Sequence, residues 1–197
     1  MPHYYSETQT SALRLNKINS FLLSHTIEFH TGSGVFSTKR IDVGTELLIN
    51  SAIVKEGWSV LDIGCGYGPV GIAIAKAYPK TRVTMTDVNK RAVKLAKMNI
   101  KLNKIENADV LDSNLYNSLT GKKFNAILTN PPQTAGKEVC FEIIEKAPHF
   151  LGDKGLLQLV ARHNKGGKHL SIKMQEVFGN VKEIAKKSGY RVYVSEL

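Results

Sequence analysis

The chain has 197 residues, of which 42% are hydrophobic and 22% are charged, the composition of one ordinary globular domain. That balance excludes a disordered chain, and no apolar stretch approaches the roughly 18 residues that a membrane-spanning helix needs. The polar N-terminus lacks the apolar core of a secretion signal, so we expect a cytoplasmic protein without membrane contact. The two cysteines, Cys65 and Cys140, form no spacing pattern, which argues against a disulfide framework or a bound metal.

Basic side chains outnumber acidic ones, and the excess is unevenly distributed. The formal net charge at pH 7 is +10, from 27 Lys and Arg against 17 Asp and Glu. Residues 58–120 carry nine basic and five acidic side chains, and residues 154–197 carry nine and three, whereas 1–57 and 121–153 are balanced. Such a field attracts polyanions, of which nucleic acid is the commonest. A solvated basic surface is the simpler alternative.

The elements predicted from periodicity begin after residues 1–25, a polar stretch that fits no element clearly. A strand at 26–31 and a helix at 42–54 come first. Strands and helices then alternate, with strands at 59–63, 82–86, 108–111, 124–129 and 155–161 and helices at 70–78, 89–101, 136–151 and 168–178. Two strands, 181–185 and 190–194, close the chain around a short turn and must be antiparallel.

This alternation predicts an α/β fold with a seven-stranded, mostly parallel sheet, an antiparallel closing strand and helices on both faces. We treat residues 1–57 as an N-terminal extension and 58–197 as the doubly wound core of a single domain, 1–197. In such sheets ligands bind beyond the carboxyl ends of the strands, so the residues that follow each strand are the candidate site.

A glycine-rich turn, Gly64 to Gly68, follows the strand at 59–63. Glycine permits positive φ and lets a ligand approach the backbone closely. Gly66, Gly68 and Gly71 form a G-x-G-x-x-G pattern, which also fits a nicotinamide dinucleotide fold. A tight strand-to-helix turn without a ligand is the plainest alternative.

Two acidic residues favour a cofactor that carries an ammonium group and a ribose but no phosphate. Asp62, two residues before the first glycine, would repel a pyrophosphate and attract an ammonium group. Asp87 ends the next strand, where a carboxylate can accept hydrogen bonds from both ribose hydroxyls. S-adenosylmethionine has these groups, and we expect it to be bound by Asp62, Gly64, Cys65, Gly66, Gly68, Asp87 and Val88. We expect Cys65 to be a small residue that fits the turn and not a nucleophile.

The tetrapeptide Asn130-Pro131-Pro132-Gln133 follows the buried strand at 124–129. Two prolines fix the backbone and remove two N–H donors, so a rigid strand-ending turn is one interpretation. In the functional interpretation, the Asn130 side-chain carbonyl and the Pro131 backbone carbonyl hold a substrate NH2 group. Its nitrogen is then aimed at a sulfonium methyl for an in-line displacement driven by positioning. We expect Asn130 and Pro131 to be catalytic, Asn130 also to contact the cofactor, and Pro132 and Gln133 to contact the substrate.

These motifs resemble those of class I methyltransferases, with VLDIGCGYG as the first motif and the acid of TMTDVN on the second strand. The segments 34–37 and 40–48, taken with N-P-P, resemble the small-domain methyltransferases related to the 16S ribosomal RNA guanine-N2 methyltransferase. The resemblance covers about residues 26–195. It implies a Rossmann-like class I methyltransferase fold in a single-domain, archaeal-type form.

The same resemblance implies further roles at the cofactor. Phe36 and Thr45 would lie over its methionine end, with Thr45 binding the carboxylate near a helix N-terminus; a core position is the alternative for Phe36. Asn114 stands where the family has an acid that binds the adenine amino group, and Asp109 or Asp112 could substitute.

N-P-P followed by an aromatic residue is typical of methyltransferases that act on adenine N6, guanine N2 or a glutamine amide. The residue at the aromatic position is Gln133, which weakens the case for stacking and for adenine. Arg162 and Lys165 follow the strand at 155–161, and we expect them to approach RNA phosphate.

We therefore expect an S-adenosylmethionine-dependent, metal-free N-methyltransferase that acts on an exocyclic amine of RNA, with guanine N2 of ribosomal RNA favoured and S-adenosylhomocysteine as product. The alternatives are methylation of a protein glutamine amide, an NAD-dependent oxidoreductase, and a non-catalytic RNA-binding protein.

Overall fold

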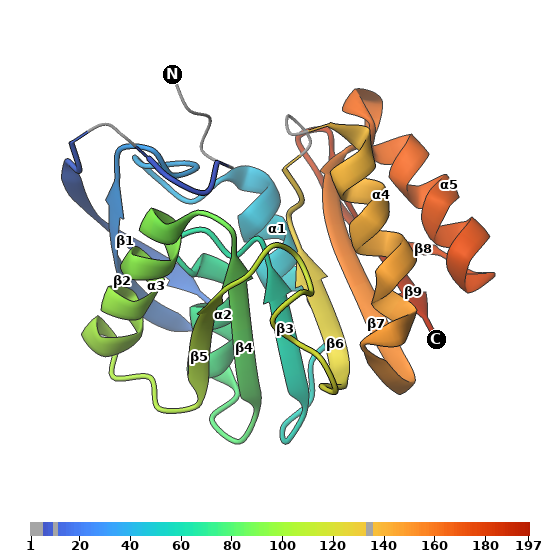
Figure 1. Ribbon diagram of the computed structural model, residues 1–197, viewed down its shortest axis with the longest axis horizontal. Coiled ribbons are helices and arrows are strands. Elements are labelled where there is room, and N and C mark those ends of the chain that lie inside the picture. The colour runs from blue at the N-terminus through green and yellow to red at the C-terminus, as the bar shows by residue number, and fades with distance from the viewer. Residues whose placement is uncertain (1–5, 10–11, 133–135) are drawn as a thin grey trace.

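The computed structural model describes residues 6–9, 12–132 and 136–197 (Figure 1). In chain order its elements are β1 (Leu15–Leu22), β2 (His25–Gly32), α1 (Val43–Ser51), β3 (Ser59–Ile63), α2 (Pro69–Ala77), β4 (Arg82–Asp87), α3 (Lys90–Leu102), β5 (Ala108–Asp112), β6 (Phe124–Thr129), α4 (Lys137–Lys146), the 3-10 turn η2 (Ala147–His149), β7 (Leu151–Arg162), the 3-10 turn η3 (His163–Lys165), α5 (Gly167–Phe178), β8 (Lys182–Lys187) and β9 (Tyr190–Glu196).

Seven strands form the main sheet in the order β5-β4-β3-β6-β7-β9-β8. The pairs from β5 to β7 are all parallel, whereas β9 runs antiparallel to both β7 and β8. The predicted fold class is confirmed in both its parallel body and its antiparallel closing strand. The carboxyl ends of β3, β4, β5 and β6 meet at one edge of the sheet, which is where a ligand is expected.

Side chains alternate between the two faces of the central strands, and each face has its own apolar core. On β3, Val60 joins the core built with α1, α2 and α3, whereas Leu61 and Ile63 join the core built with α4 and α5. Helices α4 and α5 lie together beside β7 and β9 (Figure 1). Asp62 therefore faces the α2 side, at the start of the glycine turn.

One predicted boundary is wrong at the passage from α4 to β7. The helix predicted to reach residue 151 ends at Lys146, and Pro148 follows in η2. Proline has no N–H to donate and its ring clashes with the preceding turn, so an α-helix cannot continue through it. Leu151 instead begins β7, four residues before the predicted strand.

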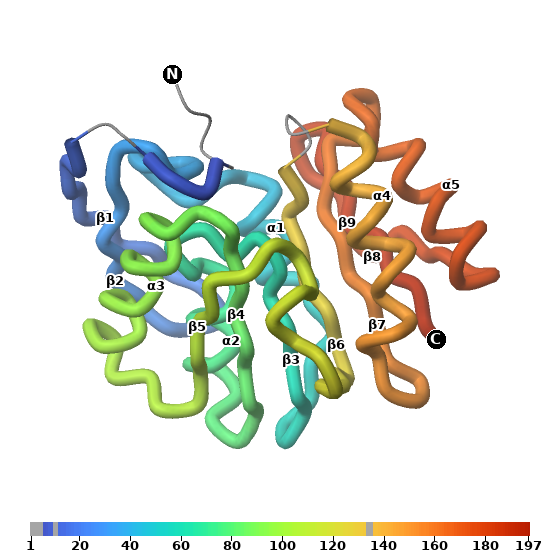
Figure 2. The backbone as a smooth tube through the Cα atoms, viewed as in Figure 1, coloured from blue at the N-terminus to red at the C-terminus, as the bar shows by residue number. Residues whose placement is uncertain are grey.

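The N-terminal stretch that fitted no element contains β1, which pairs antiparallel with β2 in a separate two-stranded ribbon. Leu23 and Ser24 both have positive φ, as a tight two-residue hairpin turn requires. The tube in Figure 2 shows this ribbon beside α3, on the opposite side of the molecule from α5.

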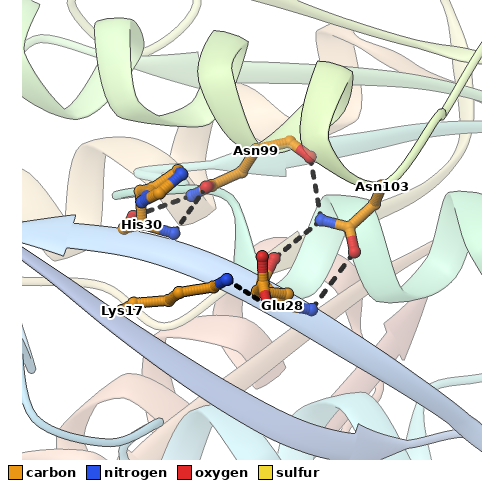
Figure 3. A network of polar contacts seen from close by, with 5 residues as sticks. All are labelled: Lys17, Glu28, His30, Asn99 and Asn103. Atoms are coloured by element: carbon orange, nitrogen blue, oxygen red, sulfur yellow. Dashed lines mark hydrogen bonds and ion pairs between the residues drawn. The ribbon is translucent and has the colours of Figure 1, made fainter.

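Asn99 in α3 and Asn103, its C-cap residue, attach the ribbon to the core (Figure 3). The Asn99 side chain accepts a hydrogen bond from His30 N at 2.7 Å and donates to His30 O at 2.9 Å. One helical turn later, Asn103 accepts from Glu28 N at 3.2 Å and donates to Glu28 O at 2.7 Å. The two asparagines are four residues apart, one turn of helix, and the two strand residues that they contact are two apart, on one edge of β2. The side-chain amides thus pair with that edge as the backbone of another strand would.

Helix α1 is held at both ends. The Asp42 carboxylate caps its first turn by accepting from Gly44 N and Thr45 N. Just beyond its last turn, both backbone groups of Ile53 bond to the buried side-chain amide of Gln158 on β7, each at 2.8 Å. The second contact holds the end of α1 against β7, and the hydrogen bond from Asn130 Nδ2 to Thr45 Oγ1 places its start at the carboxyl end of β6. None of the helices in the described parts of the chain is long and apolar enough to cross a membrane.

Candidate cofactor and acceptor site

A cavity of about 350 Å³ lies at the carboxyl edge of the sheet. The loops after β3, β4, β5 and β6 line it, together with the loop after β2 and the start of α1. The predicted site residues that line it are Phe36, Thr45, Asp62, Gly64, Cys65, Gly66, Asp87, Val88, Asn114, Asn130, Pro131 and Pro132. Gly68, Arg162 and Lys165 are not among its lining residues, and Gln133 lies outside the described residues.

The glycine turn leaves open space where a ligand can approach the backbone. Gly64 and Gly66 have φ of 69° and 59°, and a Cβ added at either would meet nothing within 4 Å. Gly64 N and Cys65 N both donate to Thr86 O at 2.9 Å, which ties the turn to the end of β4. Glycine is required at these two positions by backbone conformation, and the cavity lies directly over them.

The other two glycines of the G-x-G-x-x-G pattern, Gly68 and Gly71, are needed for other reasons. Gly68 has φ 94° and is the N-cap of α2, where an added Cβ would approach Ile72. At Gly71 an added Cβ would lie 2.4 Å from Met85, so this glycine allows α2 to pack closely on β4. Gly68 therefore has a structural role in starting α2, and its contact with the cofactor stays a prediction.

Asp62 is buried and Asp87 is half-buried, and the two carboxylates organise the turn. Asp62 Oδ2 accepts from Gly71 N at 2.9 Å, and Asp87 Oδ2 accepts from Gly66 N at 2.8 Å. Burial, with a smaller contribution from the charge of Asp87, raises the pKa of Asp62 to about 7, against the lowering effect of the hydrogen bond from Gly71. Burial also raises the pKa of Asp87. Such pKa values identify a place where a bound cation would stabilise the charged carboxylate.

Other residues around the glycine turn also line the cavity and leave polar groups available to a ligand. Thr86 Oγ1, buried in the cavity wall, is the one buried side-chain polar atom without a hydrogen-bond partner in the described parts of the chain. Asn114 lines the cavity, whereas the alternatives Asp109 and Asp112 are exposed and lie outside it. Phe36 is 40% exposed and lines the cavity, so the alternative of a core aromatic is wrong.

Cys65 has the inert environment expected of a small residue in the turn. Its side chain is 4% exposed, and burial, then the charges of Asp87 and Asp62, raise the pKa of its thiol. A thiol that stays protonated is a poor nucleophile. No cluster of three or more His, Cys, Asp or Glu side chains suited to a metal ion occurs within residues 6–9, 12–132 and 136–197.

The acceptor half of the site centres on Asn130, directly after β6. Its Nδ2 donates to Thr45 Oγ1 at 2.9 Å and to Asp42 Oδ2 at 3.4 Å. Asp42 also lines the cavity, and its other oxygen, Oδ1, accepts from the Tyr190 hydroxyl at 3.1 Å. Asn130 was predicted from the sequence, whereas Asp42 and Tyr190 were not. The sequence signal for Asp42 is the N-cap pattern Asp-x-Gly-Thr that it begins.

The first turn of α1, which contains Thr45, is already capped by Asp42. The N–H groups of Gly44 and Thr45 already donate to Asp42, at 2.9 and 3.2 Å. A carboxylate that approached this helix N-terminus would meet the negative charge of Asp42. These two backbone N–H groups are therefore already used by Asp42, and the role of Thr45 toward the methionine carboxylate stays a prediction.

Arg162 and Lys165 follow β7 at the same edge and are both exposed. The Arg162 guanidinium lies over the Tyr190 ring, 4.9 Å from its centroid. Neither basic residue lines the cavity.

Comparison with known proteins places this site in a family. Residues 26–194 match the methyltransferase small domain. The uncharacterized protein YbxB of Bacillus subtilis strain 168 is 37% identical over 192 residues, which are 96% of this chain and 96% of that protein. A chain of this size therefore recurs in a bacterium.

Two longer relatives carry functional names. Ribosomal RNA small subunit methyltransferase C of Enterobacter sp. strain 638 is 34% identical over 164 residues, which are 81% of this chain and 46% of that protein. The structure of the T. thermophilus 16S rRNA N2 G1207 methyltransferase (RsmC) in complex with AdoMet and guanosine superposes with a TM-score of 0.81 at 24% identity. The superposition covers 96% of this chain and 52% of the other. This chain thus spans about half the length of these two relatives, and it belongs to the methyltransferase small domain family.

Proposed function

We propose that the protein is an S-adenosylmethionine-dependent N-methyltransferase that acts on an exocyclic amine of RNA, with guanine N2 of ribosomal RNA as the acceptor. The observation that carries this proposal is the side chain of Asn130, held by Thr45 and Asp42 at the edge of a cavity floored by Gly64 and Gly66. The names of the longer relatives support ribosomal RNA as the substrate.

In the cofactor half, Asp62 would attract the ammonium group of S-adenosylmethionine and Asp87 would accept from its ribose hydroxyls. Each carboxylate oxygen has a second lone pair beyond the backbone hydrogen bond that it already accepts. Asn114 would accept from the adenine amino group, with Val88 beside it. Phe36 and the Thr45 hydroxyl would lie at the methionine end. When bound, S-adenosylmethionine supplies a sulfonium methyl for nitrogen and leaves as S-adenosylhomocysteine.

In the acceptor half, the Asn130 side-chain carbonyl and the Pro131 backbone carbonyl would accept hydrogen bonds from the two hydrogens of the amine. That arrangement fixes the plane of the NH2 group and directs the nitrogen lone pair toward the cofactor side of the cavity. The contribution to rate comes from orientation of two reactants in one site, so a strong general base is not required. Pro132 and Gln133 would lie against the acceptor base.

The basic balance of the chain supports RNA over a protein glutamine amide. The net charge of +10 favours a polyanionic substrate, and the exposed Arg162 and Lys165 would contact its phosphates. The buried Asp62 disfavours NAD, because a pyrophosphate over the glycine turn would face its charge. We place the enzyme in the cytoplasm with its RNA substrate.

Incubation with tritiated S-adenosylmethionine and unmodified total RNA, followed by nucleoside analysis, tests the proposal. We expect label in N2-methylguanosine and in the ribosomal RNA fraction. Label in another nucleoside would refute the acceptor, and label in protein would favour the glutamine-amide alternative. Micromolar binding of NADH without binding of S-adenosylmethionine would refute the whole class of activity.

A further inference from the structure

We propose that Asp42 is a positioning residue for methyl transfer: it fixes the orientation of the Asn130 amide so that the carbonyl, and not the NH2 group, faces the acceptor amine. The proposal rests on the function proposed above, and it concerns a residue that caps a helix 88 positions away in the sequence. Three contacts carry it.

The first contact decides which end of the Asn130 amide faces α1. A carboxylate can only accept hydrogen bonds, and Asp42 Oδ2 already accepts from two backbone N–H groups of that helix. The amide atom 3.4 Å from Oδ2 must therefore be Nδ2, because a carbonyl oxygen there would oppose a carboxylate. Thr45 Oγ1, which can donate or accept, does not make this choice by itself. With Nδ2 committed to α1, Oδ1 is the atom left for the substrate.

The second contact fixes the other oxygen of Asp42. The Tyr190 hydroxyl, at the start of β9, donates to Oδ1 at 3.1 Å. This prevents the carboxylate from rotating away from Asn130 while it still caps the helix. A helix cap by itself needs neither Asn130 nor Tyr190, so the contacts exceed what capping requires.

The third contact is the glycine that admits the Tyr190 ring. A Cβ added at Gly44 would lie 2.6 Å from two ring carbons of Tyr190 and 2.9 Å from Asp42 Oδ2. Real Cβ atoms do not approach other atoms so closely, so the tyrosine reaches Asp42 only because residue 44 has no side chain. Residues from α1, β6 and β9 thus converge on one carboxylate.

The orientation of the Asn130 amide matters because the acceptor amine offers only hydrogen-bond donors through its two hydrogens. An exocyclic NH2 presents two donors, and Asn130 helps only by offering an acceptor. If the amide turned over, its own NH2 would face the amine NH2 and disfavour binding in the reactive orientation. Loss of Asp42 should then lower kcat while leaving the cofactor half of the cavity intact.

Three substitutions separate this role from helix capping. Ser caps a helix as well as Asp but is too short to bridge Asn130 and Tyr190, so Asp42→Ser keeps the cap and loses the positioning. Asp42→Asn keeps an oxygen toward Asn130, and its NH2 can donate to the Tyr190 oxygen. Asp42→Ala loses both roles. The thermal unfolding temperature of each variant measures the loss of helix capping, independently of any loss of methyl transfer.

We expect Asp42→Ser to lower kcat about 10- to 100-fold, with the dissociation constant for S-adenosylmethionine within about threefold of wild type. Asp42→Asn should restore kcat to within a few-fold. Wild-type kcat in Asp42→Ser, or an equal loss in Asp42→Asn, would overturn the proposal.

A second readout does not depend on the substrate. In a 15N-labelled protein, the Asn130 side-chain NH2 resonances, assigned by their absence from Asn130→Ala, should exchange slowly with solvent in wild type and in Asp42→Asn. They should exchange fast in Asp42→Ser. Equal exchange in wild type and Asp42→Ser would refute the positioning of the amide. If the wild type methylates no RNA, the function proposed above fails, while this measurement still decides the role of Asp42.

Discussion

The two halves of the site are built on different principles. In the cofactor half the decisive hydrogen bonds join residues close in the sequence, such as Asp62 to Gly71, nine apart, and Asp87 to Gly66, 21 apart. In the acceptor half they join residues 85, 88 and 148 positions apart. One half is a property of a local strand-turn-helix unit, whereas the other exists only once the whole sheet has assembled.

The chemical groups differ as well. The cofactor half uses two carboxylates, Asp62 and Asp87, that are held by backbone N–H groups, and glycines that leave open space. The acceptor half uses the orientation of one side-chain amide, which depends on Asp42 and Thr45. We therefore expect single substitutions to affect affinity in the cofactor half and turnover in the acceptor half.

The largest effect should come from Asn130→Ala. Removal of the amide takes away one of the two acceptors that orient the amine, and we expect kcat to fall about 100- to 1000-fold. The affinity for S-adenosylmethionine should change little, because the glycine turn and both aspartates remain. Steady-state kinetics and calorimetric titration with the cofactor measure the two quantities.

Asn117→Ala is a matched control, since Asn117 is exposed and does not line the cavity. It should leave both kcat and affinity unchanged. Unchanged turnover in Asn130→Ala would remove Asn130 from the mechanism and favour a protein that binds RNA without methylating it.

The next largest effect should come from Gly66→Ala. A side chain at φ 59° costs about 1–2 kcal/mol of stability, and the new methyl group would occupy the cavity over the turn. We expect affinity for S-adenosylmethionine to fall more than tenfold, with kcat at saturating cofactor close to wild type.

Gly121→Ala distinguishes strain from obstruction. Gly121 has φ 76° and equally open space for a Cβ, but it does not line the cavity. Both variants should lose similar stability in thermal unfolding, and only Gly66→Ala should lose cofactor affinity. An equal loss of affinity in both would attribute the effect to stability and not to the site.

The contrast between the halves explains which features could be predicted. Apolar strand runs alternating with helices define the parallel sheet. Asp62 and Asp87 lie at the ends of β3 and β4, and Gly64 and Gly66 follow β3, in an order that the sequence displays directly. All four line the cavity. The order of strands, turns and helices along the sequence is enough to predict the cofactor half, because the topology of the sheet decides at which edge a ligand binds.

The rest depends on long-range pairing that periodicity does not contain. β1 was not predicted because its sequence, LNKINSFL, is mostly exposed and its partner strand lies across a two-residue turn. The meeting of Asp42, Asn130 and Tyr190 requires knowledge of how β9 inserts beside β7. Asp42 alone shows an N-cap, and nothing in its neighbourhood indicates a second partner.

The smallest expected effect is the pH dependence of cofactor binding through Asp62. Burial raises the pKa of this carboxyl to about 7, so in the empty site it is largely protonated at pH 6. An ammonium group binds the charged form, and the affinity for S-adenosylmethionine should rise about fivefold from pH 6 to pH 7. It should fall again above about pH 8, where an α-amino group loses its proton.

The stability of the empty protein should follow the opposite trend. A carboxyl whose folded pKa exceeds its unfolded value of 3.8 binds more protons when folded, so unfolding becomes easier as pH rises from about 4 to 7. Each pH unit in that window removes at most about 1.4 kcal/mol for this group. Asp62→Asn should flatten the acid side of the affinity profile and reduce the stability slope, leaving the part due to Asp87, whose pKa is also raised. Titration calorimetry and thermal unfolding from pH 5 to 9 measure both trends, and an affinity profile identical in Asp62→Asn and wild type would show that Asp62 does not meet the ammonium group.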